Sequence, residues 1–377
     1  MQAVRTPIGR RNGSLSNVSS PRLLSAVQVA VLDRAGLDAG EVDQLVGGCV
    51  TQAGMQAINV TRMAWLTSGT DFTAAATTID CQCGSGLQAN TMMAGLIATG
   101  GARIGIACGV EHMSGVPLRT ALEAHPTKPR DAEWPWTGEA ATQFEGAERI
   151  AARHGFGRAD LDQFGVRSQA LAKAAWDAGR FTAETVPIEF SKDGRPSTLD
   201  RDEGLRDTDA ASLARLNPII EGGLHTAGTA SQISDGAAAL LWLDEEVAKA
   251  RSLRPRALIA YHTMVGCDPY YYLDGPVEAT RKMLSQSGFT IADFDVVECN
   301  EAFASVPLAF QRSFDVPDEK LNPNGGAIAT GHPVGASGAR LLVSTINELE
   351  RIDGELGYIT MCQGGSLGIA VVVQRLC

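Results

Sequence analysis

Cysteine and histidine side chains stand in glycine-rich turns of the sequence, where they could act as a nucleophile and as proton carriers. Cys83 follows an apolar segment and precedes Gly84-Ser85-Gly86 and an expected helix. A thiol at the start of a helix faces the positive end of the helix dipole, which favours the thiolate and predicts a nucleophile. For Cys83 taken alone, however, a buried and inert cysteine is the favoured interpretation. Cys81, two residues earlier, is expected within the strand as a structural residue.

His332 lies in a similar turn, between Gly331 and Pro333. A neutral imidazole beside a thiol is a common way to generate a nucleophile, so we expect His332 to be the base that serves Cys83. A histidine that only supports its loop is the alternative.

Two further candidates follow apolar segments. Cys362 leads into Gln363-Gly364-Gly365, where a second thiol could act as an acid or base and the Gly364 amide as an oxyanion donor. Asn300 comes directly after Cys299 and could hold a water or a carbonyl group.

Short apolar segments that alternate with helical stretches must position these residues. The expected strands are Met1–Val4, Val42–Val46, Thr77–Cys81, Ile104–Cys108, Ala237–Leu243, Ala257–Tyr261, Val296–Cys299, Tyr358–Cys362 and Ile369–Val373. Near-continuous apolar strands between helices are typical of a sheet covered on both faces, which predicts an α/β fold.

Composition excludes several classes of protein. The chain has 377 residues, of which 44% are hydrophobic and 20% charged, as in a globular protein. It has no apolar run of the roughly 18–20 residues that a membrane span needs, and we expect no membrane partner. The net charge of −11 without a basic block argues against nucleic acid. The N-terminus lacks a signal peptide and the eight cysteines lack a disulfide framework, so we expect a cytoplasmic protein.

The chain matches itself at an offset of 252 residues, which predicts two similar halves. Gly36 falls on Gly288, Asp43 on Asp295, Ser85 on Ser337 and Gly86 on Gly338. These identities are too few to prove a repeat, but the order of elements agrees as well. Helices expected at Leu23–Ala35 and Leu87–Thr99 correspond to helices expected at Val277–Gln286 and Ala339–Arg351.

A segment of different composition, Pro117 to Leu224, separates the two halves. It carries many charges, Trp134-Pro135-Trp136, and expected helices at Gln143–His154 and Leu161–Ala178. Such a long insertion is usually functional, although a surface elaboration is the alternative. We therefore predict an N-terminal half of residues 1–116 completed by 225–250, a loop domain of residues 117–224, and a C-terminal half of residues 251–377.

Taken together, these segments resemble a thiolase over essentially the whole chain. Cys83-Gly84-Ser85-Gly86, Asn300-Glu301-Ala302-Phe303-Ala304, Gly331-His332-Pro333 and Cys362-Gln363-Gly364-Gly365 occur in thiolase order and at thiolase-like separations. The resemblance implies a five-layered α-β-α-β-α sandwich of two similar halves with an inserted loop domain. It also implies an acetyl-CoA acyltransferase that cleaves a 3-ketoacyl-CoA.

The resemblance assigns a role to each candidate residue. Cys83 would take the acyl group, and His332 would remove its proton and then help to bind the thioester oxygen with a water held by Asn300. Cys362 would protonate the departing acetyl-CoA carbanion, and the amides of Cys83 and Gly364 would form a second oxyanion hole.

The resemblance also implies coenzyme A as a co-substrate, with no permanently bound cofactor and no metal. Coenzyme A would lie between the loop domain and the core, in contact with Arg206, Ala227, Ser231 and Phe303. A solvated surface arginine is the alternative for Arg206. Thiolases are usually homodimers or homotetramers, so a second copy is the expected protein partner.

Departures from the small-substrate members bear on the acyl group. Residues 141–148 lack the His-Met-Gly turn of biosynthetic thiolases, and several stretches look like actinobacterial thiolases of steroid breakdown. These stretches are Asp80–Cys83, Gly223–Gly228, Pro269–Pro276 and Thr360–Cys362. The favoured substrate is therefore a bulky, steroid-type acyl group in a degradative pathway. A small-chain acetoacetyl-CoA thiolase is the alternative, and Trp134, Trp136 and Tyr270–Tyr272 are candidates for the pocket lining.

Three other functions stay open from the residues alone. A ketosynthase-like condensing enzyme also uses a cysteine, but it usually pairs it with two histidines or with histidine and asparagine. A zinc site built from Cys81, Cys83, His332 and Cys362 would need a tetrahedral arrangement that a Cys-x-Cys pair on one extended segment suits poorly. A non-catalytic acyl-CoA-binding protein is the third.

Overall fold

The computed structural model describes residues 2–124 and 133–376 and contains two main β-sheets. In the first sheet the strand order is β1-β8-β5-β3-β4, and the short β2 also pairs with β8. These strands are β1 (Ala3–Arg5), β2 (Gly9–Arg10), β3 (Gln44–Gly48), β4 (Ala75–Ile79), β5 (Ile104–His112) and β8 (Ser234–Leu243). The second sheet has the order β10-β11-β12-β9, from strands β9 (Ala257–Gly266), β10 (Val296–Cys299), β11 (Leu356–Gln363) and β12 (Leu367–Arg375).

Strand directions confirm that the two halves are alike. In the first sheet β1 and β5 run antiparallel to β8, while β3 runs parallel to β5. The second sheet repeats this pattern, because β9 and β11 run antiparallel to β12 while β10 runs parallel to β11. The predicted offset of 252 residues also relates the strands of the two halves, because β3 and β5 of the first half begin 252 residues before β10 and β11 of the second.

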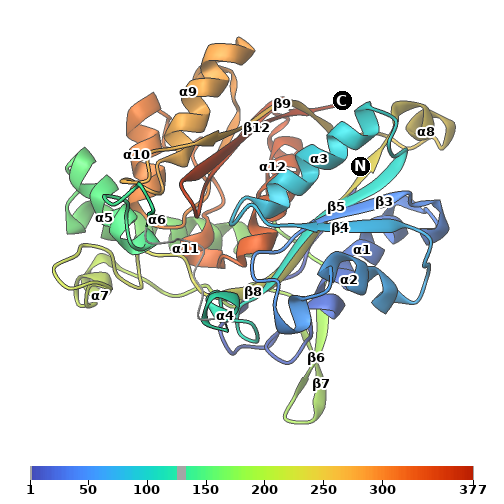
Figure 1. Cartoon of the computed structure of the whole chain (residues 1–377), viewed down its shortest axis with the longest axis horizontal. Helices are drawn as coiled ribbons and strands as arrows, with labels where there is room; N and C mark the ends of the chain where they lie inside the picture. Colours follow the sequence, from blue (N-terminus) through green and yellow to red (C-terminus); the bar gives the residue numbers. More distant parts are fainter. Residues whose placement is uncertain (1, 125–132, 377) are drawn as a thin grey trace.

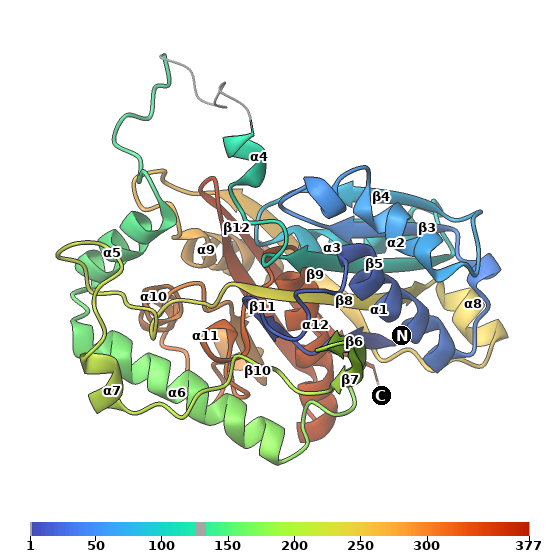
Figure 2. The ribbon, with the colours of Figure 1, turned by 90° about the horizontal axis from the view of Figure 1, so that it is seen from below.

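Helices form three layers around the sheets, as Figures 1 and 2 show. Helices α1 (Ser20–Ala35) and α2 (Val60–Ser68) cover the outer face of the first sheet. The central layer is the pair α3 (Ser85–Ala98) and α12 (Val334–Ile352), and α9 (Gly275–Ser287) and α10 (Ser305–Phe314) lie outside the second sheet. The result is the five-layered sandwich that the resemblance implies.

The region between β5 and β8 contains the predicted insertion. It holds α4 (Thr120–Glu123), α5 (Gln143–His154), α6 (Arg158–Asp177), the hairpin β6–β7 (Ile188–Lys192 and Arg195–Leu199) and α7 (Ala210–Ala214). The two remaining helices of the described chain are α8 (Glu245–Ala250), after β8, and α11 (Ala327–Thr330), before α12. The predicted helix at Gln143–His154 is confirmed residue for residue, whereas the domain limits at 117 and 224 stay a prediction. In the part of the chain that the structure describes, no helix has the length and apolar character to cross a membrane.

Close packing of α3 against α12 depends on glycine. A Cβ atom at Gly86 would lie 2.7 Å from Gly335 O and 2.9 Å from Ala339 N, and one at Gly338 would lie 2.4 Å from Leu87 N. Real side chains never approach backbone atoms so closely, so the two helices can cross at this distance only without these Cβ atoms. The crossing brings the N-termini of the two central helices, and the turns before them, close together.

Candidate active site

The first predicted turn begins just after β4. This strand ends at Ile79, so Cys81 lies beyond the strand, and the prediction that it lies inside was wrong. The backbone reverses at Gln82, which has a φ of 52°, and Cys81 N donates to Ser85 Oγ at 2.8 Å. Cys83 is thereby placed directly before α3, half-buried.

Burial decides the protonation state of Cys83. It raises the pKa of the Cys83 thiol to about 11 and outweighs the amide N–H groups of Gly364 and Cys83, which favour the thiolate. The carboxylates of Glu111 and Asp80 raise this pKa further. The contribution of the helix dipole stays a prediction, but the net effect of the surroundings opposes the thiolate, because desolvation dominates. At neutral pH the resting side chain is a thiol that needs a base.

Cys362 lies close to Cys83 although 279 residues separate them in the sequence. It stands near the end of β11, is only 1% exposed, and has a pKa raised well above the usual value by burial and then by the nearby Cys83 sulfur. Gln363 joins the two turns, since its Nε2 donates to Cys81 O at 3.0 Å. A Cβ at Gly84 would meet Gln363 Nε2 at 1.6 Å, so a larger residue there would displace the Gln363 side chain from this position.

His332 is buried at the N-terminus of α12 and is hydrogen-bonded through both ring nitrogens. Ser337 Oγ donates to Pro333 O at 2.9 Å, so its lone pair accepts from His332 Nδ1 at 2.6 Å. The proton therefore sits on Nδ1, and Nε2 accepts from Asn300 Nδ2 at 3.4 Å. Burial, and then the positive charge of Arg340, lower the pKa of His332 to about 3. The imidazole is neutral at pH 7, and Nε2, whose lone pair accepts from Asn300, is its basic nitrogen.

Asn300 lies between His332 and the strand that carries Cys362. It follows β10, and its backbone N–H donates to Thr360 O at 3.0 Å, two residues before Cys362. Its side-chain Oδ1 is buried and has no hydrogen-bond partner among the described residues, so it can accept from a bound group. Within the same residues no hydrogen bond joins Cys83 to His332, and the expectation that His332 serves Cys83 as its base stays a prediction.

Sequence reasoning missed the residues that hold this site together. Glu301, fully buried, accepts from Ser168 Oγ at 2.6 Å, Asn322 Nδ2 at 2.9 Å and Ile328 N at 3.2 Å, which fixes the turn after Asn300. Glu111 likewise accepts from Val50 N, Thr51 N, Gln56 Nε2 and Gly335 N. Glu301 stands in the quoted Asn300–Ala304 motif, and that was the available signal.

The four predicted coenzyme A contacts differ in exposure. Arg206 and Ala227 are exposed and Ser231 is half-buried, whereas Phe303 is only 3% exposed and packs edge-on against Phe144 and His225. Ser231 N donates to Ala302 O at 2.9 Å, which ties the segment of Ala227 and Ser231 to the segment of Phe303.

Arg206 is linked to the turn of His332 through Gln232. Its Nη2 donates to Gln232 Oε1 at 3.2 Å, and the Gln232 carbonyl accepts from His332 N at 3.2 Å. The segment of Ala227 and Ser231 is therefore hydrogen-bonded to the turn of His332. Phe303 lies in the turn that follows Asn300. Among residues 2–124 and 133–376, no group of three or more His, Cys, Asp or Glu side chains could hold a metal ion.

Comparison with known proteins decides the family. The family model for the thiolase N-terminal domain matches residues 1–246, and the model for the thiolase C-terminal domain matches residues 253–375. The chain belongs to the thiolase family. It is an acyltransferase of the kind that acts on acyl-CoA substrates.

Relatives of this thiolase carry several names. It is 38% identical to the steroid 3-ketoacyl-CoA thiolase FadA6 of Mycobacterium tuberculosis, over 100% of this chain and 93% of that protein. It is 39% identical to an acetyl-CoA acetyltransferase of Chromobacterium violaceum, over 99% and 98% of the two chains. Among solved structures, human mitochondrial 3-ketoacyl-CoA thiolase matches with a TM-score of 0.90 at 34% identity, covering 99% and 98% of the two chains.

Proposed function

We propose that this thiolase cleaves a 3-ketoacyl-CoA with coenzyme A, in the degradative direction, through an acyl-enzyme on Cys83. The observation that carries the proposal is the approach of two thiols of raised pKa, Cys83 and Cys362, together with a neutral imidazole that Asn300 links to the strand of Cys362. One thiol can form a covalent bond while the other handles a proton, which Claisen cleavage requires and simple hydrolysis does not.

Each proton transfer of the proposed reaction then has a donor group and an acceptor group. His332 Nε2 takes the thiol proton as Cys83 Sγ attacks the keto carbon, and the C2–C3 bond of the substrate breaks. Cys362 gives its proton to the carbanion of the departing acetyl-CoA. When the coenzyme A thiol attacks the acyl-enzyme, its proton returns to Cys362, and the proton on His332 returns to Cys83.

Two oxyanion sites support these steps. The amides of Cys83 and Gly364 already favour negative charge on the Cys83 sulfur, and the same donors suit the oxygen of a tetrahedral intermediate. The opposite site would use His332 Nε2 once protonated, with a water that hydrogen-bonds to Asn300. Coenzyme A would lie along Arg206, Ala227, Ser231 and Phe303. The proposed reaction needs no permanently bound cofactor.

A bulky, steroid-type acyl group is the substrate we propose. The loop of Pro269–Tyr272 lies next to the Cys362 turn, because Cys267 N donates to Ser366 O at 2.8 Å. Tyr270 is 47% exposed and Trp136 is 56% exposed, and Arg149 links their segments by donating to Gly138 O and Tyr270 O. Exposed aromatic side chains near the catalytic turn suit a large apolar acyl group. The likeness to the steroid thiolase agrees with this substrate.

Thiolysis assays with matched variants test the proposal. We would follow coenzyme A-dependent loss of acetoacetyl-CoA and of a steroid-type 3-ketoacyl-CoA, using wild type, Cys83→Ala and Cys81→Ala. Turnover that disappears in Cys83→Ala and persists in Cys81→Ala supports the acyl-enzyme, because the two cysteines share one turn. Equal turnover in both variants would refute it.

The second candidate is a small-chain acetoacetyl-CoA thiolase. Its support is the acetyl-CoA acetyltransferase at 39% identity, a likeness as strong as that to the steroid enzyme. Turnover of acetoacetyl-CoA alone would select it, and binding of acyl-CoA without turnover of either substrate would favour a non-catalytic protein.

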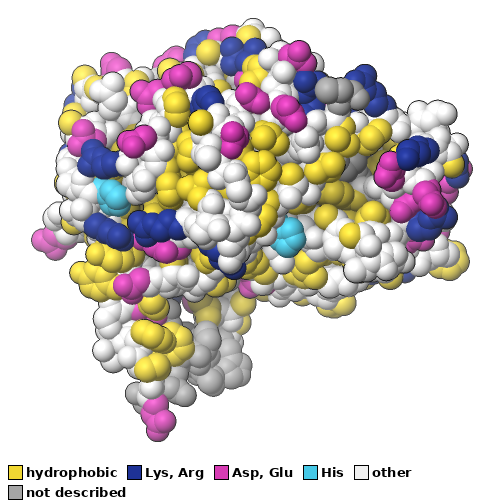
Figure 3. Space-filling model, turned by 90° about the horizontal axis from the view of Figure 1, so that it is seen from above, with side chains coloured by type: hydrophobic (Ala, Val, Ile, Leu, Met, Phe, Trp, Pro, Cys, Tyr) yellow, Lys and Arg dark blue, Asp and Glu magenta, His cyan; other side chains and the backbone are white. Residues whose placement is uncertain are grey.

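We also propose a cytoplasmic homo-oligomer. Figure 3 shows hydrophobic side chains gathered over the middle of one face of the molecule. The exposed apolar side chains of the chain include Met92 of α3 and Leu258 of β9, which are 40% and 38% exposed. An apolar face of this kind suits a second copy of the chain. Light scattering of the purified protein would show a monomer if this proposal is wrong.

A further inference from the structure

A small internal cavity adjoins the turns that carry His332 and Asn300. Its volume is about 10 Å³, and its lining includes Glu298, Thr330 and Arg340. Glu298 comes two residues before Asn300, and Thr330 comes two residues before His332. The walls of the cavity therefore continue into the turn of the candidate base and into the turn of the asparagine bonded to it.

Two buried polar side chains of this cavity lack direct partners. Arg340, on α12, is 6% exposed, and its Nε and Nη2 have no hydrogen-bond partner among the described residues. Glu298, on β10, is 2% exposed, and its Oε2 has no such partner within the same residues. A guanidinium stays charged in proteins, and burying it without hydrogen bonds is unfavourable. A group bound inside the cavity would supply the bonds that both side chains need.

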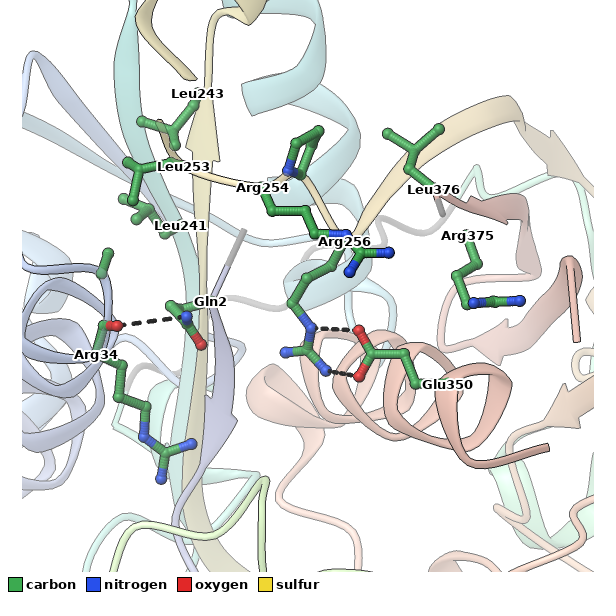
Figure 4. A pocket seen from close by; sticks show the side chains of 12 residues that line it. Gln2, Arg34, Leu241, Leu243, Leu253, Arg254, Arg256, Glu350, Arg375 and Leu376 are labelled. Atoms are coloured by element: carbon green, nitrogen blue, oxygen red, sulfur yellow. Dashed lines mark hydrogen bonds and ion pairs between the residues drawn. The ribbon is translucent and has the colours of Figure 1, made fainter. Parts of the chain in front are cut away.

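Other charged side chains near α12 do have direct partners. Figure 4 shows Arg256 beside the last turn of this helix, where it donates to both carboxylate oxygens of Glu350 at 2.7 Å and 2.6 Å. The charged groups that act on Arg340 and Glu298 are paired as well. They are Arg5 with Glu184 and Asp202, Glu301 with Ser168 and Asn322, and Glu348 with Arg351 and Asn324.

The charge of Arg340 acts on His332. Burial raises the pKa of Glu298 to about 8, so at pH 7 this carboxyl group mostly holds a proton and does not neutralise the guanidinium. Burial first, and then the positive charge of Arg340, lower the pKa of His332 to about 3. Arg340 comes eight residues after His332, about 12 Å along the helix axis, and helical side chains tilt toward the N-terminus. The guanidinium therefore extends toward the imidazole.

A single water molecule fits the cavity. A volume of about 10 Å³ is close to the lower limit for one water, and a buried water makes about two to four hydrogen bonds. Its oxygen can accept from Arg340 Nε or Nη2 while one O–H group donates to Glu298 Oε2. A metal cation would be repelled by the guanidinium, and the volume excludes a larger ligand.

We propose that a water bound in this cavity joins Arg340 to Glu298, and that Arg340 is a positioning residue whose charge keeps the His332 imidazole neutral. The inference rests on the proposed function, in which His332 takes the Cys83 proton and later returns it. A cation near the ring disfavours the imidazolium, so the proton goes back to the Cys83 sulfur when the acyl group leaves.

Nitrogen NMR of the His332 ring in the full chain tests the charge effect without any substrate. We expect the wild-type imidazole to stay neutral between pH 8 and pH 5. One charge about 12 Å away, at an effective dielectric constant of about 20, changes a protonation equilibrium by about tenfold. Arg340→Gln should therefore raise the protonated fraction of His332 at pH 5 by about tenfold, whereas Arg340→Lys keeps the charge and should match wild type.

Glu298→Gln is the matched control. This residue lines the same cavity, and its side chain is uncharged at pH 5 both before and after the change. A structural disturbance of the cavity would alter the His332 signal in both glutamine variants, whereas the charge effect alters it in Arg340→Gln alone. Equal signals in Arg340→Gln and wild type, or the same change in both glutamine variants, overturn the positioning role. If Arg340→Gln does not fold, wild type still tests the proposal, because an imidazole protonated at pH 5 contradicts it.

A high-resolution crystal structure of the wild-type protein tests the water. We expect one ordered water within about 3.2 Å of an Arg340 guanidinium nitrogen and of Glu298 Oε2. A direct hydrogen bond between the two side chains, or no ordered atom between them, overturns the water site. Neither experiment involves turnover, so a thiolysis assay in which Cys83→Ala stays active would refute the proposed function separately.

Discussion

Replacing Ser337 with alanine should slow thiolysis, because it removes the group that sets the tautomer of His332. The Ser337 hydroxyl accepts from His332 Nδ1 at 2.6 Å, and both side chains are buried. In Ser337→Ala the Nδ1 proton has no acceptor, which destabilises the resting imidazole and destabilises more strongly the imidazolium that forms when Nε2 takes the Cys83 proton. Only the difference between the two raises the barrier, and a difference of about 1–3 kcal/mol corresponds to a loss in kcat of about 5- to 150-fold.

The readouts distinguish a positioning role from general damage. Ser344→Ala is the matched control, because Ser344 is a buried serine of the same helix that donates to Glu184 at 3.2 Å, away from the imidazole. We expect Ser337→Ala to lose kcat with KM for coenzyme A changed less than about twofold, and Ser344→Ala to keep both values. Nitrogen NMR of the imidazole should show the Nδ1–H tautomer in wild type and a mixture in Ser337→Ala. Equal kcat in the two variants would refute the reasoning.

Three further predictions concern ionisation and packing. Alkylation of Cys83 by iodoacetamide should rise about tenfold per pH unit from pH 7 and level off near pH 11, where the thiol titrates; a plateau below pH 9 would contradict this. Gly86→Ala should lower the denaturation midpoint by several degrees, whereas Gly95→Ala on the same helix, with open space around its Cβ, should not lower it. Burial raises the pKa of Glu298 to about 8, so the folded state holds a proton that the unfolded state releases near pH 4.5, and stability falls between these values. Glu298→Gln should flatten that fall, which denaturant midpoints at pH 5 and pH 8 would measure.

The sequence predicted the elements better than the environment of the site. Helix Gln143–His154 and strand Val296–Cys299 were predicted to the residue, because capping residues and apolar runs mark their ends locally. Strand β4 was predicted two residues late, because Ala75 and Ala76 are weak strand signals and the strand is an edge.

The pKa of Cys83 could not be predicted from its turn. The helix that follows it is visible in the sequence and favours the thiolate, but the groups that desolvate the sulfur come from distant parts of the chain. Asp80 is a sequence neighbour of this thiol, but Glu111 and the Gly364 turn also act on it, and only the fold brings these two to it. The tautomer of His332 was hidden for a similar reason, since it depends on the direction in which the Ser337 hydroxyl donates.

The weak internal repeat has a physical explanation at the helix crossing. Gly86 matches Gly338 at the predicted offset, and each faces the backbone of the opposite central helix at a distance that admits no Cβ atom. Each glycine within a helix lowers stability by about 0.5–1 kcal/mol relative to alanine. The close crossing of the two helices, which alanine would prevent, explains why both positions are glycine. It draws together the turn of Cys83 from one half and the turn of His332 from the other, beside the strand end of Cys362, whose pKa the nearby Cys83 raises. A nucleophile and a separate proton donor for one substrate can thus be supplied by two copies of one α/β unit.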